Sequence, residues 1–397
     1  MRLFVRAALA AQFLLLGFFF TAASAQEDDG PFQLFPGDNA LSIYAGGWLN
    51  GGQTFNAHGN KTAGAARSAP FNTPSDGFVF NQIWGFVGRD VDTSEQMFDV
   101  GFRVDYVFGS DAPDTSSFGD GGWDFLWTSN NRQDYGSAIP QIYGEFAVND
   151  LSVKVGHFYT IIGYEVVTAP DNFFYSHAYT MNYGEPFTHT GALGTYALGD
   201  FVTLYGGYTF GWDSGFDNFF EAGTFLGGVG LQLTDDIALT WACNAGNMGN
   251  GTTVGGNVGN IYMNSWVLDV ALTENLQSIS QHDFGTNTAL PGGGSAQWYG
   301  LNQYMIYTLN DNWSLGTRTE WFADPNGARV ANGNGDYYAM TAGVNWKPIQ
   351  NFILRPELRW DWFAPYTAGK AYDFDPVAMA NTRNSLFTFG IDGILTY

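Results

Sequence analysis

The chain has 397 residues and a net charge of −23, yet only 13% of its residues are charged, against about 25% in an average soluble domain. Glycine is abundant, with 52 residues, and aromatic residues make up 17%. A chain this rich in aromatic residues is not an intrinsically disordered acidic protein. Beyond residue 25 it has no apolar run of about 18 residues that would form a transmembrane helix. The composition leaves a large soluble β protein or a transmembrane β-barrel, in which alternate residues carry the apolar surface.

Residues 1–25 have the pattern of a signal peptide, with two arginines, an apolar core and small residues at Ala23 and Ala25 before a polar stretch. We therefore expect secretion, and loss of the two arginines leaves a net charge of −25. Cys243 is the one cysteine, so an intramolecular disulfide is impossible and the fold must supply its own stability. The chain is predicted to divide into a signal peptide, a short lead-in and a barrel, at 1–25, 26–38 and 39–397.

Sixteen segments rich in Val, Phe, Tyr, Trp and Thr predict β-strands, and no amphipathic helix of useful length lies between them. The strands are expected at 39–48, 78–88, 97–108, 139–148, 151–158, 188–198, 201–211, 223–233, 237–246, 260–272, 276–284, 296–309, 312–322, 337–347, 351–362 and 385–397.

The connections between these segments alternate in length. Seven are short, such as Asn149-Asp150 and Gly199-Asp200, whose residue types suit tight hairpin turns. Eight are longer, such as 109–138 and 159–187. Outer-membrane barrels combine short periplasmic turns with long extracellular loops. The alternation therefore predicts an up-and-down antiparallel transmembrane β-barrel, all-β in class, with about sixteen strands.

The charged residues within the predicted strands all fall on the face opposite the apolar one. In 97–108, for example, Asp99, Arg103 and Asp105 alternate with apolar residues. A charge on a lipid-facing surface costs about 2–4 kcal/mol at mid-bilayer, so the charges are expected to face the lumen. A soluble sandwich or barrel with its apolar face inward is the alternative, but so many aromatic residues would overfill its interior. The predicted lumen charges are Asp99, Arg103, Asp105, Glu145, Lys154, Asp269, Arg318, Glu320, Lys347, Arg355, Glu357, Arg359, Asp361 and Asp392.

Aromatic residues gather at strand ends and predict two girdles at the membrane interfaces. The expected members are Trp48, Phe108, Phe158, Trp212, Trp241, Tyr307, Trp313, Trp321, Trp346, Trp360 and Trp362. The last segment alternates apolar residues and ends on an aromatic one, Tyr397. This ending resembles the assembly signal of outer-membrane barrel proteins.

Several segments together resemble the OmpL-like outer-membrane β-barrel porin family. They are Gly156-His157-Phe158-Tyr159-Thr160, Ala169-Pro170, Asn172-Phe173-Phe174-Tyr175-Ser176, Glu185-Pro186-Phe187-Thr188-His189-Thr190-Gly191 and Asn81-Gln82. The resemblance covers nearly the whole chain after the signal peptide. It implies a pore in the outer membrane, in contact with lipid, and it says little about the solute.

The connection 159–187 is the third long loop, which in sixteen-stranded porins folds inward and narrows the pore; this chain resembles them in that position. Strands in the last third of a sixteen-stranded barrel lie across from it. We therefore expect a constriction in which loop acids face wall arginines. An alternative is that wall acids pair those arginines along neighbouring strands. The loop acids are Glu165, Asp171 and Glu185, the wall arginines are Arg318, Arg355 and Arg359, and the competing wall acids are Glu320, Glu357 and Asp361.

The lumen set contains eight acids and six bases, so the acid excess lies mostly in loops and turns. This distribution predicts a passive diffusion channel for small hydrophilic solutes and ions, with a weak cation preference that salt weakens. A substrate-selective channel, for example for a sugar stacking on Trp298 and Tyr304, is an alternative. A non-conducting structural or surface-interaction barrel is another. A homotrimer is possible, with the glycine-rich segments 188–198 and 223–233 in a subunit contact.

Other functions have weaker support in the sequence. A hydrolase would need a nucleophile beside a base, and no Gly-x-Ser-x-Gly elbow surrounds Ser176 or any other serine. Asp171, His177, Glu185 and His189 are suitable metal ligands by type, but their spacing matches no strong motif. Basic patches that would bind nucleic acid are absent. We therefore expect no enzymatic activity, no metal and no cofactor.

Overall fold

The computed structural model of the chain describes residues 32–33, 42–56, 77–117, 135–218, 221–249, 259–288, 294–330, 333–375 and 380–397. The chain divides into two units, Met1–Phe32 and Gln33–Tyr397. The predicted signal peptide and nearly all of the predicted lead-in lie outside the described residues. In the described part of the chain no helix is long and apolar enough to cross a bilayer.

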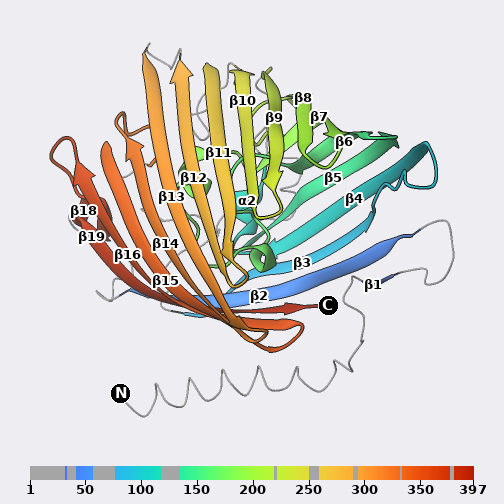
Figure 1. Cartoon of the computed structure of the whole chain (residues 1–397). Helices are drawn as coiled ribbons and strands as arrows, with labels where there is room; N and C mark the ends of the chain where they lie inside the picture. The colour runs from blue at the N-terminus through green and yellow to red at the C-terminus, as the bar shows by residue number, and fades with distance from the viewer. Residues whose placement is uncertain are drawn as a thin grey trace. The chain divides into compact units, whose positions relative to one another are not determined.

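The second unit is built around sixteen antiparallel strands (Figure 1). These are β2 (Tyr44–Asn56), β3 (Val79–Arg89), β4 (Phe98–Gly109), β5 (Gly136–Val148), β6 (Leu151–Tyr159), β7 (Thr188–Leu198), β8 (Val202–Thr209), β9 (Gly223–Thr234), β10 (Ile237–Asn247), β11 (Asn260–Thr273), β12 (Leu276–Thr288), β13 (Ser295–Asn310), β14 (Trp313–Asp324), β15 (Gly335–Ile349), β16 (Phe352–Pro365) and β19 (Ser385–Thr396). Three short strands lie outside this set: β1 (Phe32–Gln33), and β17 (Tyr372–Asp375) paired with β18 (Ala380–Arg383).

The sheet closes on itself because its last strand pairs with its first. Leu395 of β19 lies opposite Leu49 of β2, and the antiparallel register continues to Thr388 opposite Asn56. All other neighbours in the barrel are consecutive hairpin partners. A closed barrel has no free strand edge, so the backbone groups of every strand are paired without help from water.

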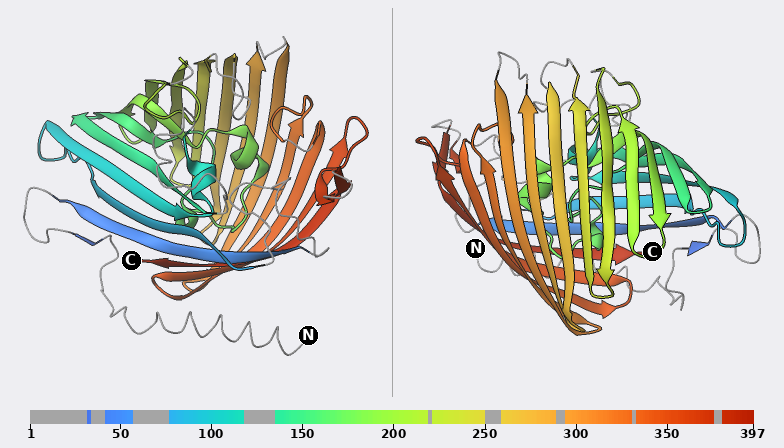
Figure 2. Two further views of the ribbon diagram at one scale, coloured as in Figure 1. Left: turned by 180° about the vertical axis from the view of Figure 1, so that it is seen from behind. Right: turned by 45° about the horizontal axis from the view of Figure 1, so that its top comes forward.

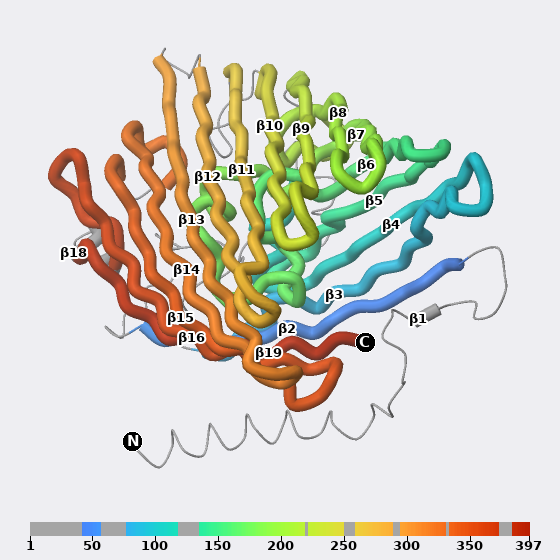
Figure 3. The backbone as a smooth tube through the Cα atoms, in the orientation of Figure 1, coloured from blue at the N-terminus to red at the C-terminus, as the bar shows by residue number. Residues whose placement is uncertain are grey.

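The two ends of the barrel carry connections of different length. Asn149-Asp150 and Gly199–Phe201 are tight turns, with Asn149 at φ 50° and Gly199 at φ 64°, the left-handed region that such turns require. The tight turns gather at one end of the tube drawn in Figure 3. The connections at the other end are mostly longer, among them 110–135, 160–187 and 366–384. This alternation agrees with the expectation from sequence.

All sixteen expected segments form strands of the barrel, and β7 begins and ends at the expected residues. The largest difference concerns the first strand, which was expected at 39–48 but runs from Tyr44 to Asn56. Its second half was missed because Asn50, Gly52 and Thr54 are small or polar residues that face inward and give a weak strand signal.

Exposed apolar residues lie on the outer face of the strands, and polar residues lie on the inner face. On β4, Phe98 and Val100 are 53% and 44% exposed, whereas Asp99 between them is 6% exposed. The same alternation continues on β16, where Leu358 and Trp360 are exposed and Arg359 is buried. This parity is what a barrel surrounded by lipid requires.

Three residues of the expected aromatic girdles instead lie inside the barrel. Trp48, Phe158 and Trp212 are at most 5% exposed. Trp48 stacks on Trp84 at a centroid distance of 4.7 Å and donates its Nε1 hydrogen to Gln82 at 2.8 Å. The prediction failed for them because position near a strand end does not determine the face. Trp313, Trp346 and Trp360 are exposed on the outer face, as expected.

Long connections occupy much of the interior. Both views in Figure 2 show the short helix that follows β4 and the segment between β6 and β7 within the ring of strands. The first contains the short helix α2 (Ala112–Thr115), and the second contains a 3-10 turn, η2 (Ala169–Asp171), and a π-helical turn, η3 (Thr180–Gly184). The connection 160–187 contacts the walls of β3, β13 and β16.

Candidate functional site

The connection 160–187 is anchored to walls far apart around the barrel. Gln82 of β3 donates its side-chain amide to the carbonyl of Val167 at 2.7 Å. Arg355 of β16 donates to the carbonyls of Ala169 and Asn172 at 2.9 and 2.6 Å. These contacts hold the connection inside the barrel. They place the loop predicted to form the constriction against wall charges on β14 and β16.

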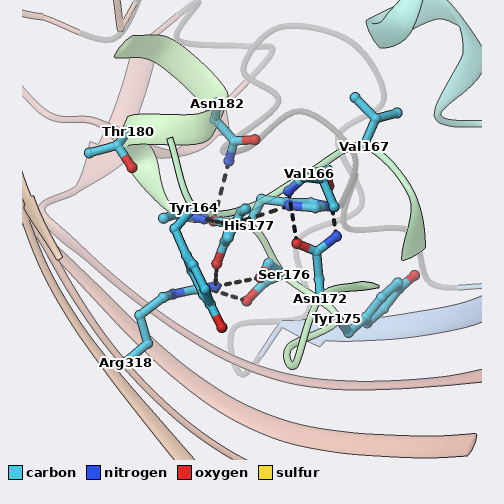
Figure 4. A network of polar contacts seen from close by, with 12 residues as sticks. Tyr164, Val166, Val167, Asn172, Tyr175, Ser176, His177, Thr180, Asn182 and Arg318 are labelled. Carbon is cyan, nitrogen blue, oxygen red and sulfur yellow. Dashed lines mark hydrogen bonds and ion pairs between the residues drawn. The ribbon is translucent and has the colours of Figure 1, made fainter. Parts of the chain in front are cut away.

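Glu165 of this loop forms an ion pair with Arg318 of β14, with 2.7 Å between Nη1 and Oε1. Arg318 is fully buried and also donates to the carbonyl and the hydroxyl of Ser176, at 2.6 and 3.0 Å (Figure 4). Glu165 accepts the backbone N–H of Ala178 at 2.7 Å. One loop acid therefore faces one wall arginine.

The negative charge of the Glu165 carboxyl is compensated by its hydrogen-bond and ion-pair partners. Burial raises the pKa of Glu165, but Arg318, His177 and the N–H of Ala178 outweigh it and lower the pKa to about 2. Nδ1 of His177 lies 3.3 Å from Oε2 of Glu165. The Glu165 carboxyl is therefore ionised at every ordinary pH.

Arg359 of β16 is paired along the wall rather than with a loop acid. Its guanidinium contacts Asp361 at 2.8 Å and Glu320 of β14 at 3.0 Å, and Arg318 donates to the same Glu320 at 2.7 Å. The loop adds backbone and phenol contacts: His177 supplies a carbonyl to Arg359 at 3.0 Å. The N–H of Tyr179 reaches Glu320 at 2.8 Å, and its hydroxyl reaches Asp361 at 3.0 Å.

Arg355 and Glu357 follow the same pattern. Arg355 pairs with Asp392 of β19, at 2.6 Å between Nη2 and Oδ2. Glu357 accepts the N–H groups of Tyr175 and Ser176, at 3.0 and 3.1 Å. The wall arginines are thus ion-paired with wall acids, and the wall charges bind the loop mainly through its backbone. Buried charges require such complete pairing.

The other two loop acids have no arginine partner among the described residues. Asp171 is exposed and accepts the hydroxyl of Thr168 at 2.5 Å. Glu185 is buried and receives the side-chain amide of Gln281, which also donates to Asp283 at 3.0 Å; both partners lie on β12. The structure therefore brings Glu165 to a wall arginine and places Asp171 and Glu185 elsewhere.

Glu185 and Asp283 form a carboxyl pair with a single neutral donor between them. Oε2 of Glu185 and Oδ2 of Asp283 are buried and have no hydrogen-bond partner in the described residues. Burial first, and then the neighbouring Asp283, raise the pKa of Glu185 well above its ordinary value. A proton held by this pair would satisfy the two remaining oxygens.

The inner wall of β4, β5 and β6 is less covered. Arg103 is ion-paired with the buried Asp105 and lies over the ring of Phe86, 3.8 Å from its centroid, with 19% of its side chain exposed. Lys154 lies 4.8 Å above the ring of Tyr143 and opposite Glu145 in register. Lys154 and Glu145 are half-buried, in contrast to the arginines of β14 and β16.

An arginine not predicted from the sequence joins three connections. The guanidinium of Arg329, in the connection between β14 and β15, lies between the rings of Trp212 and Trp298, at 4.8 and 4.9 Å from their centroids. It donates to the carbonyl of Tyr183 at 2.5 Å. Burial lowers the pKa of Arg329 to about 10. No local sequence pattern marks this residue, because its partners come from distant parts of the chain.

Other contributors missed from the sequence are Gln82, Gln281, Asp283 and Tyr179. Strand parity places Gln281 and Asp283 on the inner face and could have identified them. Trp298 and Tyr304, suggested as a sugar-stacking track, are 0% and 1% exposed. Trp298 donates to the carbonyl of Gly184 and Tyr304 donates to Glu165, so the loop covers both.

The loop residues considered as metal ligands or as a hydrolytic pair are engaged in other contacts. In the described residues no group of three or more His, Cys, Asp or Glu side chains could hold a metal ion. The Ser176 hydroxyl binds Arg318, while Nδ1 of His177 faces Glu165. The nucleophile–base contact that a serine hydrolase needs is therefore not formed by these two neighbours.

The sequence of residues 42–397 matches the protein family described as "Putative beta-barrel porin-2, OmpL-like". The chain belongs to this family of outer-membrane β-barrel porins. The resemblance noted from the sequence is confirmed. No curated protein is similar enough in sequence to count as a relative.

Solved structures of outer-membrane channels share the fold. The outer membrane channel DcaP of Acinetobacter baumannii aligns with a TM-score of 0.62 at 10% identity, over 91% of this chain and 99% of that one. OmpT of Vibrio cholerae gives 0.56 at 13% identity over 92% and 100%. The anion-selective porin from Comamonas acidovorans gives 0.55 at 10% identity over 90% and 99%. At these identities the likeness shows the sixteen-stranded barrel fold alone.

Proposed function

We propose that this porin forms a water-filled outer-membrane channel for passive diffusion of small hydrophilic solutes and ions. The observation that carries the proposal is the asymmetry of the inner wall. On β14 and β16 the charged side chains are buried beneath the loop 160–187, whereas Arg103, Glu145 and Lys154 on β4 to β6 keep exposed surface. The proposed path for solutes runs along this second wall, with the docked loop as its other side.

The proposed constriction is therefore between the loop and the wall of β4 to β6. The wall offers a paired Arg103 and Asp105, and an opposed Glu145 and Lys154. Its charges are balanced, so the narrow region has little net field of its own. Asp171 is the loop acid with exposed surface, while Glu165, Glu185, Arg318, Glu320, Arg355, Glu357, Arg359 and Asp361 serve to hold the loop in place.

A weak cation preference would arise at the mouths rather than at the constriction. Six of the seven short connections carry exposed acidic residues, so one end of the barrel is ringed by negative charge. Such a ring raises the local concentration of cations, and dissolved salt screens it. The acids are Asp90, Asp92, Glu95, Asp150, Asp200, Asp235, Asp236, Glu274 and Asp311.

Planar-bilayer recording of the purified full chain tests this proposal. We expect stepwise single-channel conductance that scales with salt concentration, and a reversal potential in a salt gradient that favours cations slightly. Absence of conductance would leave the non-conducting structural barrel as the function. A reversal potential that favours anions would refute the cation preference without refuting the channel.

A sugar-selective channel is the second candidate. Block of the ionic current by added sugars distinguishes it from a general diffusion channel. Since Trp298 and Tyr304 are covered, a sugar would have to stack on half-buried rings such as Tyr143. Conductance that small sugars block in a concentration-dependent way would favour this candidate. We also propose that the signal peptide is cleaved, that the chain resides in the outer membrane and that it assembles as a homotrimer. One solved OmpT neighbour is described as a trimer form.

A further inference from the structure

Three buried oxygen atoms lie together where the loop 160–187 meets β11 and β12. They are Oε2 of Glu185, Oδ2 of Asp283 and Oγ of Ser265, and none has a hydrogen-bond partner in the described part of the chain. The three residues are 3%, 0% and 1% exposed. Buried polar atoms in folded proteins are nearly always partnered, so three unpartnered oxygens in one place point to a bound group.

The strand register brings Asp283 and Ser265 together. Ser265 of β11 lies directly opposite Asp283 of β12. Both side chains point inward, because Trp266 and His282, the next residues on these strands, are exposed on the outer face. The Ser265 hydroxyl lies beside the Asp283 carboxyl without forming a hydrogen bond to it. Two of the three oxygens therefore come from adjacent strands of the barrel wall.

The third oxygen comes from the loop, and Gln281 holds it in place. The Gln281 amide nitrogen donates to Oε1 of Glu185 and, at 3.0 Å, to Oδ1 of Asp283. Its own carbonyl oxygen accepts the N–H of Tyr164 at 3.2 Å, and this contact fixes the orientation of the amide. The amide therefore engages one oxygen of each carboxyl, and the second oxygen of each is left for another partner.

Glycines of the loop border both carboxyl oxygens. A Cβ atom at Gly163 would overlap Oε2 of Glu185, and a Cβ atom at Gly184 would lie 3.6 Å from Oδ2 of Asp283. Glycine brings the loop backbone close to the two carboxyls and contributes no side chain that could donate to them. The loop therefore encloses the oxygens without neutralising their charge.

The arginines that hold the loop are engaged elsewhere. Arg318 pairs with Glu165, and Arg329 donates to the carbonyl of Tyr183. A single shared proton would lie between the two carboxyl oxygens and would leave the Ser265 oxygen without a partner. A metal cation contacts all three oxygens at once, because hydroxyl and carboxylate oxygens both have lone pairs to give.

We propose that Glu185, Asp283 and Ser265 bind a calcium ion. Hard divalent cations prefer oxygen ligands, and two carboxylates match the charge of one such ion. Ca²⁺ accepts irregular sets of about 6–8 oxygens, whereas Mg²⁺ demands a near-ideal octahedron. Bidentate binding by the carboxylates, together with water, supplies the remaining ligands. The site has two carboxylates and one hydroxyl, and of the four metal ligands considered from the sequence it uses Glu185 alone.

The calcium ion would hold the end of the loop that arginines do not. Arg318 and Arg355 anchor earlier parts of the loop on β14 and β16. The ion would anchor Glu185, near the end of the loop, on β11 and β12. Protons and Ca²⁺ compete for the same carboxyls, so binding releases any proton that the pair holds. The site goes beyond the proposed channel function and does not depend on conduction.

Calcium binding to the purified, folded full chain tests the site. After treatment with EDTA, bound Ca²⁺ is measured by equilibrium dialysis in about 0.1 M NaCl, which screens weak binding to exposed acids. We expect one Ca²⁺ per chain that the double variant Glu185→Gln, Asp283→Asn no longer binds. Ser265→Ala should bind it about tenfold more weakly. Asp111→Asn is the matched control and should bind as the parent does, because Asp111 is buried but both of its oxygens accept side-chain amides.

Limited proteolysis gives a second measurement, which the parent and Ser265→Ala supply even if the double variant does not fold. Ca²⁺ is expected to slow cleavage within 160–187 in the parent and in Asp111→Asn, and to do so only at higher concentration in Ser265→Ala. Equal Ca²⁺ affinity in the parent and Ser265→Ala, or cleavage of the parent that Ca²⁺ does not change, would overturn the proposal. Mg²⁺ binding as tight as Ca²⁺ binding would also overturn it. Neither measurement uses conductance, so a barrel that does not conduct leaves the result intact.

Discussion

Glu165 and Arg318 are 153 positions apart in sequence, and their side chains form an ion pair of 2.7 Å inside the barrel. The pair joins the loop 160–187 to β14. Arg318 also binds Ser176 of the same loop, so a single guanidinium holds two points of one connection. Because the pair is fully enclosed, each member depends on the other for compensation of its charge.

Removal of Arg318 is therefore expected to release the loop. Arg318→Gln leaves the Glu165 charge buried without a cation, which costs about 3–5 kcal/mol. We expect faster proteolytic cleavage within 160–187 and a noisier, larger single-channel conductance, with the barrel still folded. The double variant Glu165→Gln, Arg318→Gln is the control and should recover much of the loss. Equal cleavage of the parent and the single variant would contradict this.

The carboxyl pair of Glu185 and Asp283 predicts a pH dependence of loop docking. Since the pKa of Glu185 is raised on docking, the stabilisation is complete below its ordinary pKa and is lost as the pH rises through the raised value. The loss is about 1.4 kcal/mol per pH unit in that window. Current fluctuations should therefore increase toward alkaline pH.

Charged neighbours of this pair do not supply a counterion. The nearby arginines have other partners: Arg318 pairs with Glu165 and Glu320, and Arg359 pairs with Glu320. Arg329 donates to the carbonyl of Tyr183. His282 lies on the outer face of β12. Glu185→Gln retains the hydrogen-bonding shape without the titration, so its fluctuations should not vary with pH. A variant that follows the pH profile of the parent would assign the effect to another group.

Gly163 is required where the loop passes Glu185. Its φ is +88°, and a Cβ atom at this position would overlap the Glu185 carboxyl. Gly163→Ala is expected to loosen the loop and raise its proteolysis rate about tenfold or more. Gly199→Ala is the matched control, because Gly199 also has positive φ, +64°, but open space around it. Similar effects from both substitutions would show that backbone strain, and not the clash, is responsible.

Ion preference should depend on the exposed charges and not on the buried ones. Replacement of Asp150, Asp200, Glu274 and Asp311 by the corresponding amides should reduce the cation preference, most clearly at low salt. Lys154→Glu should increase it, because Lys154 lies on the less covered wall. The measurement is the reversal potential in a salt gradient. If the turn variants behave as the parent at low salt, the acidic mouth does not set selectivity.

We expect Arg329 to stabilise the connections 160–187 and 210–222 together. Arg329→Gln removes the cation between Trp212 and Trp298, a contact worth on the order of 2 kcal/mol when desolvated. We expect greater proteolytic sensitivity in both 160–187 and 210–222. Arg329→Lys should restore part of the protection, because it keeps the charge but not the flat guanidinium. Protection unchanged in Arg329→Gln would show that the rings hold the loops without it.

The sequence by itself determined the class of fold, the number of strands and the face on which most charges lie. Those features are local: an alternation of period two and tight turns such as Asn149-Asp150 are readable from neighbouring residues. Local reading failed for Trp48 and Trp212, because strand ends and loops do not fix a direction. It also missed the second half of β2, whose small residues carry a weak signal.

The partners of the charged residues were decided only by the tertiary structure. Sequence parity places Arg355 and Arg359 inside the barrel, but the register in which β19 pairs with β16 brings Asp392 beside Arg355. Folding of the loop brings Glu165 to Arg318 and leaves Glu185 with Asp283. These contacts join residues more than 35 positions apart, and no periodicity encodes them. Burial then compels complete pairing, because an unpaired charge inside the barrel is too costly to keep.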